Sequence, residues 1–275
     1  MGLCKGNRGN LMQHWTFAEV IEFLKQQFKS MHFITTHSMA PWTIPIKAKE
    51  GHCRRVFRQA GRRLGNLERP SIYEQHWKSL AVKSGLPYPS SAVFFASLWP
   101  ANQGSIAICE FDATTANEID GWIVNDDIAD RFLHHVVFQG DWRYSIRSPQ
   151  IWNNTAECQF IEMDPMRYSI DLRAERKKSQ PATLYPEDVE LLLSQIPSSP
   201  KCTVIMISSF SNQSGSMPLD QQRNSLATIL VRGDFKLQAD VRVGHEMASF
   251  VFTRGLQLQF EDLQERFVNW LEGIE

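Results

Sequence analysis

The sequence lacks the long apolar run that a membrane-spanning helix needs. Its 275 residues contain no uninterrupted apolar stretch of about 18 residues. The first residues, 1–6, also lack the apolar core of a secretory signal peptide. We therefore expect a soluble cytoplasmic protein that does not enter a membrane.

The chain also has little net charge and no paired cysteine pattern. Its 29 Lys and Arg residues nearly balance its 30 Asp and Glu residues, so any nucleic-acid partner would have to bind a local basic patch. The five cysteines are scattered, without a CxxC pair or zinc-ligand spacing, and the eight histidines show no metal-ligand spacing either. This composition predicts reduced thiols and no metal site.

What the chain does contain is a regular alternation of strand-like and helix-like segments. Hydrophobic residues make up 43% of the sequence, enough for the core of one large α/β domain over residues 1–275. The alternation predicts a mostly parallel sheet whose carboxyl edge binds ligands. We expect helices at 16–29, 92–98, 114–123, 187–195 and 260–271, and strands at 31–36, 105–111, 136–138, 158–163, 202–208, 238–243 and 248–253.

Residues 47–86 differ from the rest of the chain because they are basic. We interpret this segment as a mostly helical insertion after the first strand. Charge of this kind usually forms a solvated helix face, but its interleaving with apolar residues also suits contact with an RNA backbone. The candidate nucleic-acid contacts are Arg54, Arg55, Arg58, Arg62 and Arg63.

Three acids stand where an expected strand meets a loop. Glu110 ends the second strand, where a carboxylate accepts hydrogen bonds from a ribose in dinucleotide folds. Asp141 follows a glycine and could accept a hydrogen bond from an adenine amino group, with Trp142 packing against the base. Asp164 precedes Pro165, which fixes the backbone and could aim the carboxylate at a substrate amine. Each acid taken singly is more simply a helix cap.

Six short motifs follow one another along nearly the whole chain. They are Gly9-Asn10 with His14, Thr35-Thr36-His37, Tyr88-Pro89-Ser90-Ser91, Cys109-Glu110-Phe111, Gly140-Asp141-Trp142 and Met163-Asp164-Pro165. Their order resembles that of the bacterial 23S ribosomal RNA adenine-N6 methyltransferases. The last motif resembles the catalytic Asp-Pro-Pro-Tyr of that family, and the closing strand and helix match as well.

The resemblance implies a Rossmann-like fold that binds S-adenosyl-L-methionine (AdoMet) and methylates an exocyclic amine of adenine in nucleic acid, with RNA favoured over DNA. It implies that Asp164 and Pro165 form the catalytic motif and that Tyr168 stacks on a flipped base. It also implies a set of donor-binding residues: His14, His37, Ser91, Glu110, Asp141 and Trp142.

The chain departs from the family in ways that leave other hypotheses open. The loop Ser38–Trp42 contains no glycine where the family has a glycine-rich loop, and Asp164-Pro165 is followed by Met-Arg-Tyr rather than Pro-Tyr. A first alternative is a catalytically inactive relative that serves as a binding or partner module. A second is another nucleotide-dependent enzyme on the same fold, because a fold does not determine function.

Overall fold

The computed structural model describes residues 8–43, 71–76, 88–125, 128–165, 167–169, 183–211, 216–256 and 262–274. The expected insertion at 47–86 lies outside these ranges except for a helical segment at 72–76. The arginines assigned to nucleic-acid binding are outside the described residues. These arginines are Arg54, Arg55, Arg58, Arg62 and Arg63.

Seven strands form one sheet in the order β10-β11-β9-β6-β1-β4-β5. All of them run in the same direction except β11, which pairs antiparallel with β9 and with β10. This confirms the expected mostly parallel sheet, and the arrangement is that of a Rossmann-like α/β fold. The strands are β1 (Met31–Thr35), β4 (Gly104–Glu110), β5 (Phe132–Gln139), β6 (Cys158–Met163), β9 (Cys202–Phe210), β10 (Lys236–Val243) and β11 (Met247–Arg254).

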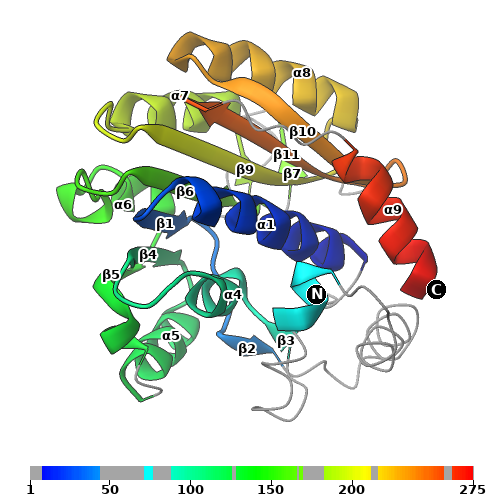
Figure 1. Cartoon of the computed structure of the whole chain (residues 1–275). Coiled ribbons are helices and arrows are strands. Elements are labelled where there is room, and N and C mark those ends of the chain that lie inside the picture. Colours follow the sequence, from blue (N-terminus) through cyan, green and yellow to red (C-terminus); the bar gives the residue numbers. More distant parts are fainter. Residues whose placement is uncertain are drawn as a thin grey trace.

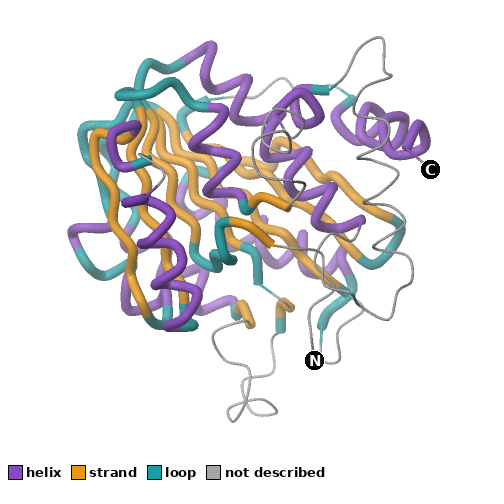
Figure 2. Tube along the Cα trace, turned by 90° about the horizontal axis from the view of Figure 1, so that it is seen from below, coloured by secondary structure: helices purple, strands orange, loops and turns teal. Residues whose placement is uncertain are grey.

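Helices cover both faces of the sheet (Figure 1; Figure 2). One face packs against α1 (Arg8–Gln27), α4 (Ser91–Leu98), α5 (Ala113–Asn125) and α9 (Leu263–Ile274). The other face packs against α6 (Trp142–Ser145), α7 (Pro186–Gln195) and α8 (Leu219–Leu230). Among the described residues, no helix is both long and apolar enough to cross a membrane.

Short elements complete the described chain. Two pairs of short strands lie outside the main sheet, one antiparallel and one parallel. The antiparallel pair joins the loop after β1 to the residues just before α4, and the parallel pair follows the end of β6. These elements are β2 (Trp42–Thr43), β3 (Tyr88–Pro89), β7 (Arg167–Tyr168), β8 (Thr183–Leu184), and the 3-10 turns η1 (Ala129–Arg131), η2 (Pro149–Ile151) and η4 (Val231–Gly233).

Because the sheet is covered on both sides, its central strands are apolar on both faces. In β6, Phe160 points into the core beneath α1, whereas Ile161 and Met163 point into the core beneath α7 and α8. Side chains alternate along a strand, so Glu162 lies on the α1 face together with Phe160. A carboxyl group is thereby placed in an otherwise apolar layer.

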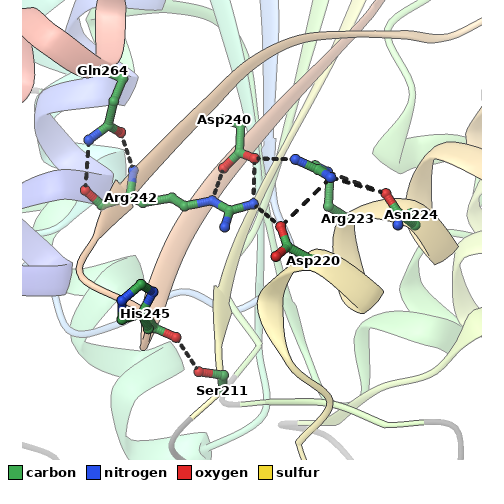
Figure 3. Close-up of polar contacts among 8 residues, drawn as sticks. All are labelled: Ser211, Asp220, Arg223, Asn224, Asp240, Arg242, His245 and Gln264. Atoms are coloured by element: carbon green, nitrogen blue, oxygen red, sulfur yellow. Dashed lines mark hydrogen bonds and ion pairs between the residues drawn. The ribbon is translucent and has the colours of Figure 1, made fainter.

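Polar side chains join the edge strand β10 to α8 and α9 (Figure 3). Arg242 donates to Asp240 on its own strand at 2.7 Å and to Asp220 on α8 at 2.8 Å. Gln264 on α9 accepts from the backbone N–H of Arg242 at 2.5 Å and donates to its carbonyl oxygen at 3.2 Å. The Gln264 amide thus pairs with backbone groups of an edge strand in the way that a neighbouring strand would.

Candidate active site

Glu110, Asp141 and Asp164 lie at the same edge of the sheet, which confirms their expected placement. Glu110 is the last residue of β4, whereas Asp141 and Asp164 follow the carboxyl ends of β5 and β6. These three strands are parallel to one another and to β1. The central strand β1 has β4 on one side and β6 on the other, so the chain order of the strands reverses there. In open α/β sheets, ligands bind in the crevice at such a reversal point.

Asp164 is half-buried and is followed by the buried Pro165. Burial, and to a smaller extent the nearby Glu162 carboxyl, together raise the pKa of the Asp164 carboxyl to about 7. A hydrogen bond from the Gln13 side chain acts in the opposite direction. Asp164 therefore changes its charge close to neutral pH, as a group that accepts a proton or a hydrogen bond at a reactive site often does.

Glu162 is a site residue that the sequence analysis missed. Its side chain is only 1% exposed, and it accepts hydrogen bonds from Ser91 Oγ and, at 3.2 Å, from Gln13 Nε2. Burial raises the pKa of its carboxyl, and these hydrogen bonds lower it. A charged residue in the apolar run Cys158–Met163 was the signal that could have identified it.

His14 and Ser91 come to the same region from two helices. His14 on α1 is buried, with its ring 5.2 Å from that of Phe94 on α4 in an edge-on arrangement. Burial lowers the pKa of His14 to about 3, so the ring is neutral at physiological pH. Ser91 begins α4 directly after Ser90, whose side chain caps the helix by accepting from the Val93 N–H. Two of the residues expected to bind the donor thus lie on the face of the sheet that carries Glu162.

His37 lies in the loop that leaves β1. Its Nδ1 is 2.7 Å from Thr36 Oγ1, and the Thr36 N–H donates to the carbonyl oxygen of Glu162 at 3.0 Å. The Ser38 N–H donates to the carbonyl oxygen of Cys109 at 3.1 Å. The loop is therefore joined by its backbone to the ends of both neighbouring strands, without a glycine.

Glu110 ends β4 with its side chain only 9% exposed. Its Oε1 accepts from the Asp112 N–H at 2.7 Å, and its carbonyl oxygen accepts from the Gly140 N–H at 2.9 Å. Gly140 has a φ of 132°, which a residue with a side chain rarely adopts. Glu110 thus places a carboxylate at the end of the strand beside β1, where a carboxylate accepts hydrogen bonds from a ribose in dinucleotide folds.

Asp141 caps the short helix α6. The sequence offered two interpretations of this acid, a helix cap and an adenine contact, and the cap is the simpler one. Its side chain accepts from the backbone N–H of Arg143 at 3.0 Å and pairs with the Arg143 guanidinium at 3.1 Å. Trp142 is 2% exposed, with Arg143 5.2 Å from its ring centre and the His37 ring 5.9 Å away. These contacts leave little of either side chain for an adenine ring, although both residues border the site.

Tyr168 is buried in the core beneath α7 and α8. Its hydroxyl is 2.7 Å from Ser225 Oγ on α8. A fully buried ring has no face on which a base could stack, so the expected stacking role of Tyr168 does not fit this structure. Within the described ranges, no group of three or more His, Cys, Asp or Glu residues could hold a metal ion.

Comparison with solved structures supports the fold assignment. The protein LPL1258 of Legionella pneumophila superposes with a TM-score of 0.62 at 14% sequence identity, over 98% of this chain and 92% of that one. At so low an identity, the likeness concerns the fold alone. No protein-family model matches the sequence, and no curated protein matches it.

Weaker likenesses extend to enzymes named as methyltransferases. A SAM-dependent methyltransferase of Aquifex aeolicus has a TM-score of 0.43 and 9% identity, over 90% of this chain and 94% of its own. An O-methyltransferase of Bacillus cereus, crystallised with SAH, has a TM-score of 0.40 and 13% identity, over 88% of this chain and 79% of its own. These scores are too low to add to the argument.

Proposed function

We propose that this protein is an AdoMet-dependent methyltransferase that acts on an exocyclic amine of adenine in RNA. The observation that carries the proposal is the position of Asp164. It follows the strand beside β1 at the carboxyl edge of a Rossmann-like sheet, and polar side chains surround it on a face that is otherwise apolar. Asp164 would accept a hydrogen bond from the amine and direct its lone pair toward the methyl donor.

The residues at this edge of the sheet are suited to bind AdoMet, the methyl donor. Glu110 would hold the ribose hydroxyl groups, because it is a carboxylate at the end of β4, next to the central strand β1. His14 and Ser91, together with His37 in the loop after β1, would contact the rest of the molecule. AdoMet supplies a methyl group on a sulfonium, which becomes a neutral thioether when the amine nitrogen takes the methyl group and loses one proton.

The chain's own residues would then act on the amine alone. Asp164 in its ionised form would accept a hydrogen bond from the N–H of the amine. It would also receive the proton that the nitrogen loses. Pro165 fixes the backbone beside this carboxylate and keeps it directed at the amine. The arginines of the insertion would contact RNA phosphates.

A second candidate function is a binding or partner module without catalysis. It is favoured by the glycine-free loop Ser38–Trp42 and by the pairing of Asp141 with Arg143. Retention of Glu110 and Asp164 at one edge favours the enzyme.

Isothermal titration of the full chain with AdoMet separates the two candidates. The proposal predicts a Kd in the micromolar range for AdoMet and much weaker binding of ATP and NAD, which test for another nucleotide-dependent enzyme. Absence of AdoMet binding would favour the partner module.

A further inference from the structure

The strand β5 forms one edge of the sheet, at the opposite side from β10 (Figure 1). Among the described residues, its only neighbouring strand is β4. On that side, the Gly140 N–H donates to the carbonyl oxygen of Glu110 at 2.9 Å. Because the direction of the backbone groups alternates along a strand, the N–H and C=O groups of Val137 and His135 point away from the sheet. Such groups are a template with which another strand can pair.

The two edges of the sheet differ in how they are protected from pairing. The strand β10 carries Lys236, Asp240 and Arg242, and Gln264 occupies the backbone N–H and carbonyl oxygen of Arg242. The strand β5, Phe132–Gln139, contains no Lys, Arg, Asp, Glu or Pro, and its register shift against β4 lies at its start. Charges, prolines and covering groups are the usual protection of an edge strand, so β5 is open to a partner and β10 is not.

Apolar side chains are exposed beside the open edge. Of six large apolar side chains exposed among the described residues, three lie here. They are Leu133 on β5 itself, 64% exposed, Val124 on α5, which packs against β5, and Phe111 directly after β4. The half-buried Val137 and Phe138 extend this apolar surface on the two faces of the strand. A strand that pairs with β5 would therefore gain apolar burial in addition to hydrogen bonds.

We propose that two copies of this chain associate through their β5 strands, antiparallel about a two-fold axis, and so join their sheets into one. An axis beside Val136 pairs His135 of each copy with Val137 of the other, and each pair exchanges two backbone hydrogen bonds. Arg131 and Asp141 lie at equal distances before and after Val136 in the sequence. The same axis therefore sets opposite charges against each other at both ends of the paired strands.

This charge pattern is the reason for choosing a second copy as the occupant of the edge. A two-fold contact uses the same patch on both molecules, so the patch must complement itself, and an antiparallel β5 pair does so in both backbone and charge. Asp141 already pairs with Arg143 within its own copy, and Arg131 of the second copy would add a cation beside that pair. The dimer does not require AdoMet binding, so it stands or falls independently of the proposed function.

The test is sedimentation equilibrium of the full chain over a range of protein concentrations. Wild type should be dimeric at high concentration and dissociate on dilution. Leu133→Lys puts a charge on the open edge and should weaken the dimer roughly tenfold or more. Val137→Pro removes an N–H that points away from β4, so it should weaken the dimer while the pairing with β4 is kept. The matched control is Leu237→Lys, the same change at an exposed leucine of β10, which should leave the dimer unchanged.

Wild type that stays monomeric at every concentration overturns the proposal and leaves the edge to an extended segment of another protein. A dimer that neither Leu133→Lys nor Val137→Pro weakens also overturns it, and so does a dimer that Leu237→Lys weakens as much as Leu133→Lys. Circular dichroism checks the folding of each variant. Should Val137→Pro fail to fold, the comparison of the two lysine variants still decides.

Discussion

Arg143 on α6 joins Asp188 on α7 through two charge-assisted hydrogen bonds, Nε to Oδ1 at 2.6 Å and Nη2 to Oδ2 at 2.7 Å. The same guanidinium pairs with Asp141 and donates to the carbonyl oxygen of Thr183 at 2.6 Å. The Arg143 side chain thus holds α6, which follows β5, against β8 and α7. Such bidentate pairs are the strongest of the ordinary side-chain contacts.

Replacing Arg143 by Ala should destabilise the fold. The change leaves Asp141 and Asp188 as partly buried acids without their cation, which costs on the order of 3 kcal/mol in comparable cases. Urea unfolding followed by circular dichroism measures the difference. Arg232→Ala, which removes an exposed ion pair with Glu190, is the control and should change stability by less than about 1 kcal/mol. Equal losses in the two variants would contradict the role given to Arg143.

Replacing Asp164 by Asn should stabilise the protein at neutral pH and above. The carboxyl pKa is about 7 in the folded protein against an ordinary value of 3.8. Between these values the folded state holds more protons than the unfolded state, so wild-type stability falls as the pH rises. The gain in free energy of unfolding should be absent below about pH 4 and grow to at most about 4 kcal/mol above about pH 7. Urea titrations at several pH values measure it, and a gain that does not depend on pH would contradict the raised pKa.

Much of the fold could be predicted because its signals are local. Apolar runs predicted the strands of the main sheet, and their order placed Glu110, Asp141 and Asp164 at one edge. Helix α8 was missed because its residues Leu219–Leu230 include the polar run Asp-Gln-Gln-Arg-Asn, which hides the apolar spacing. Helix α1 begins at Arg8, earlier than expected; its start was missed because its first three residues, Arg8-Gly9-Asn10, are polar and include a glycine.

The site was less predictable because its contacts are not local. The contact of Gln13 with Glu162 joins residues 149 positions apart, and nothing in either segment alone indicates it. The ion pair between Asp141 and Arg143 and the burial of Tyr168 beneath α8 likewise depend on how the elements pack. The position of an acid after a strand predicts the edge of the sheet at which the acid lies. The sequence does not predict the hydrogen-bond partners of that acid, because other elements bring them to the site.

Replacing Glu110 by Ala should weaken AdoMet binding more than it lowers the rate at saturating donor. The carboxylate is expected to contact the ribose, which does not change during the reaction, so its loss affects ground state and transition state alike. Isothermal titration should show a loss in affinity of roughly tenfold or more, as expected for a hydrogen bond to a charged group. Glu118→Ala, on the exposed surface of α5, is the control. Unchanged affinity in Glu110→Ala would remove Glu110 from the donor site.

Replacing the insertion arginines together by Gln should weaken RNA binding and reduce its dependence on salt. Each lost phosphate contact lowers the slope of log K against log salt by about one unit. Fluorescence anisotropy with labelled RNA over a range of salt concentrations measures both effects, with circular dichroism to confirm folding. Unchanged affinity and slope would mean that the basic run is only a solvated face. The residues are Arg54, Arg55, Arg58, Arg62 and Arg63.

The most direct test of the central claim is transfer of tritium from methyl-labelled AdoMet to RNA by wild type and Asp164→Ala, with AdoMet affinity measured in parallel. We expect wild type to label adenine in RNA and the variant to lose on the order of a hundredfold or more in rate, because it lacks the group that orients the amine in the transition state. AdoMet binding should be largely retained, and the exposed-site control Asp130→Ala should behave as wild type. Wild-type protein that labels neither RNA nor DNA, or a variant that keeps the full rate, would contradict the account.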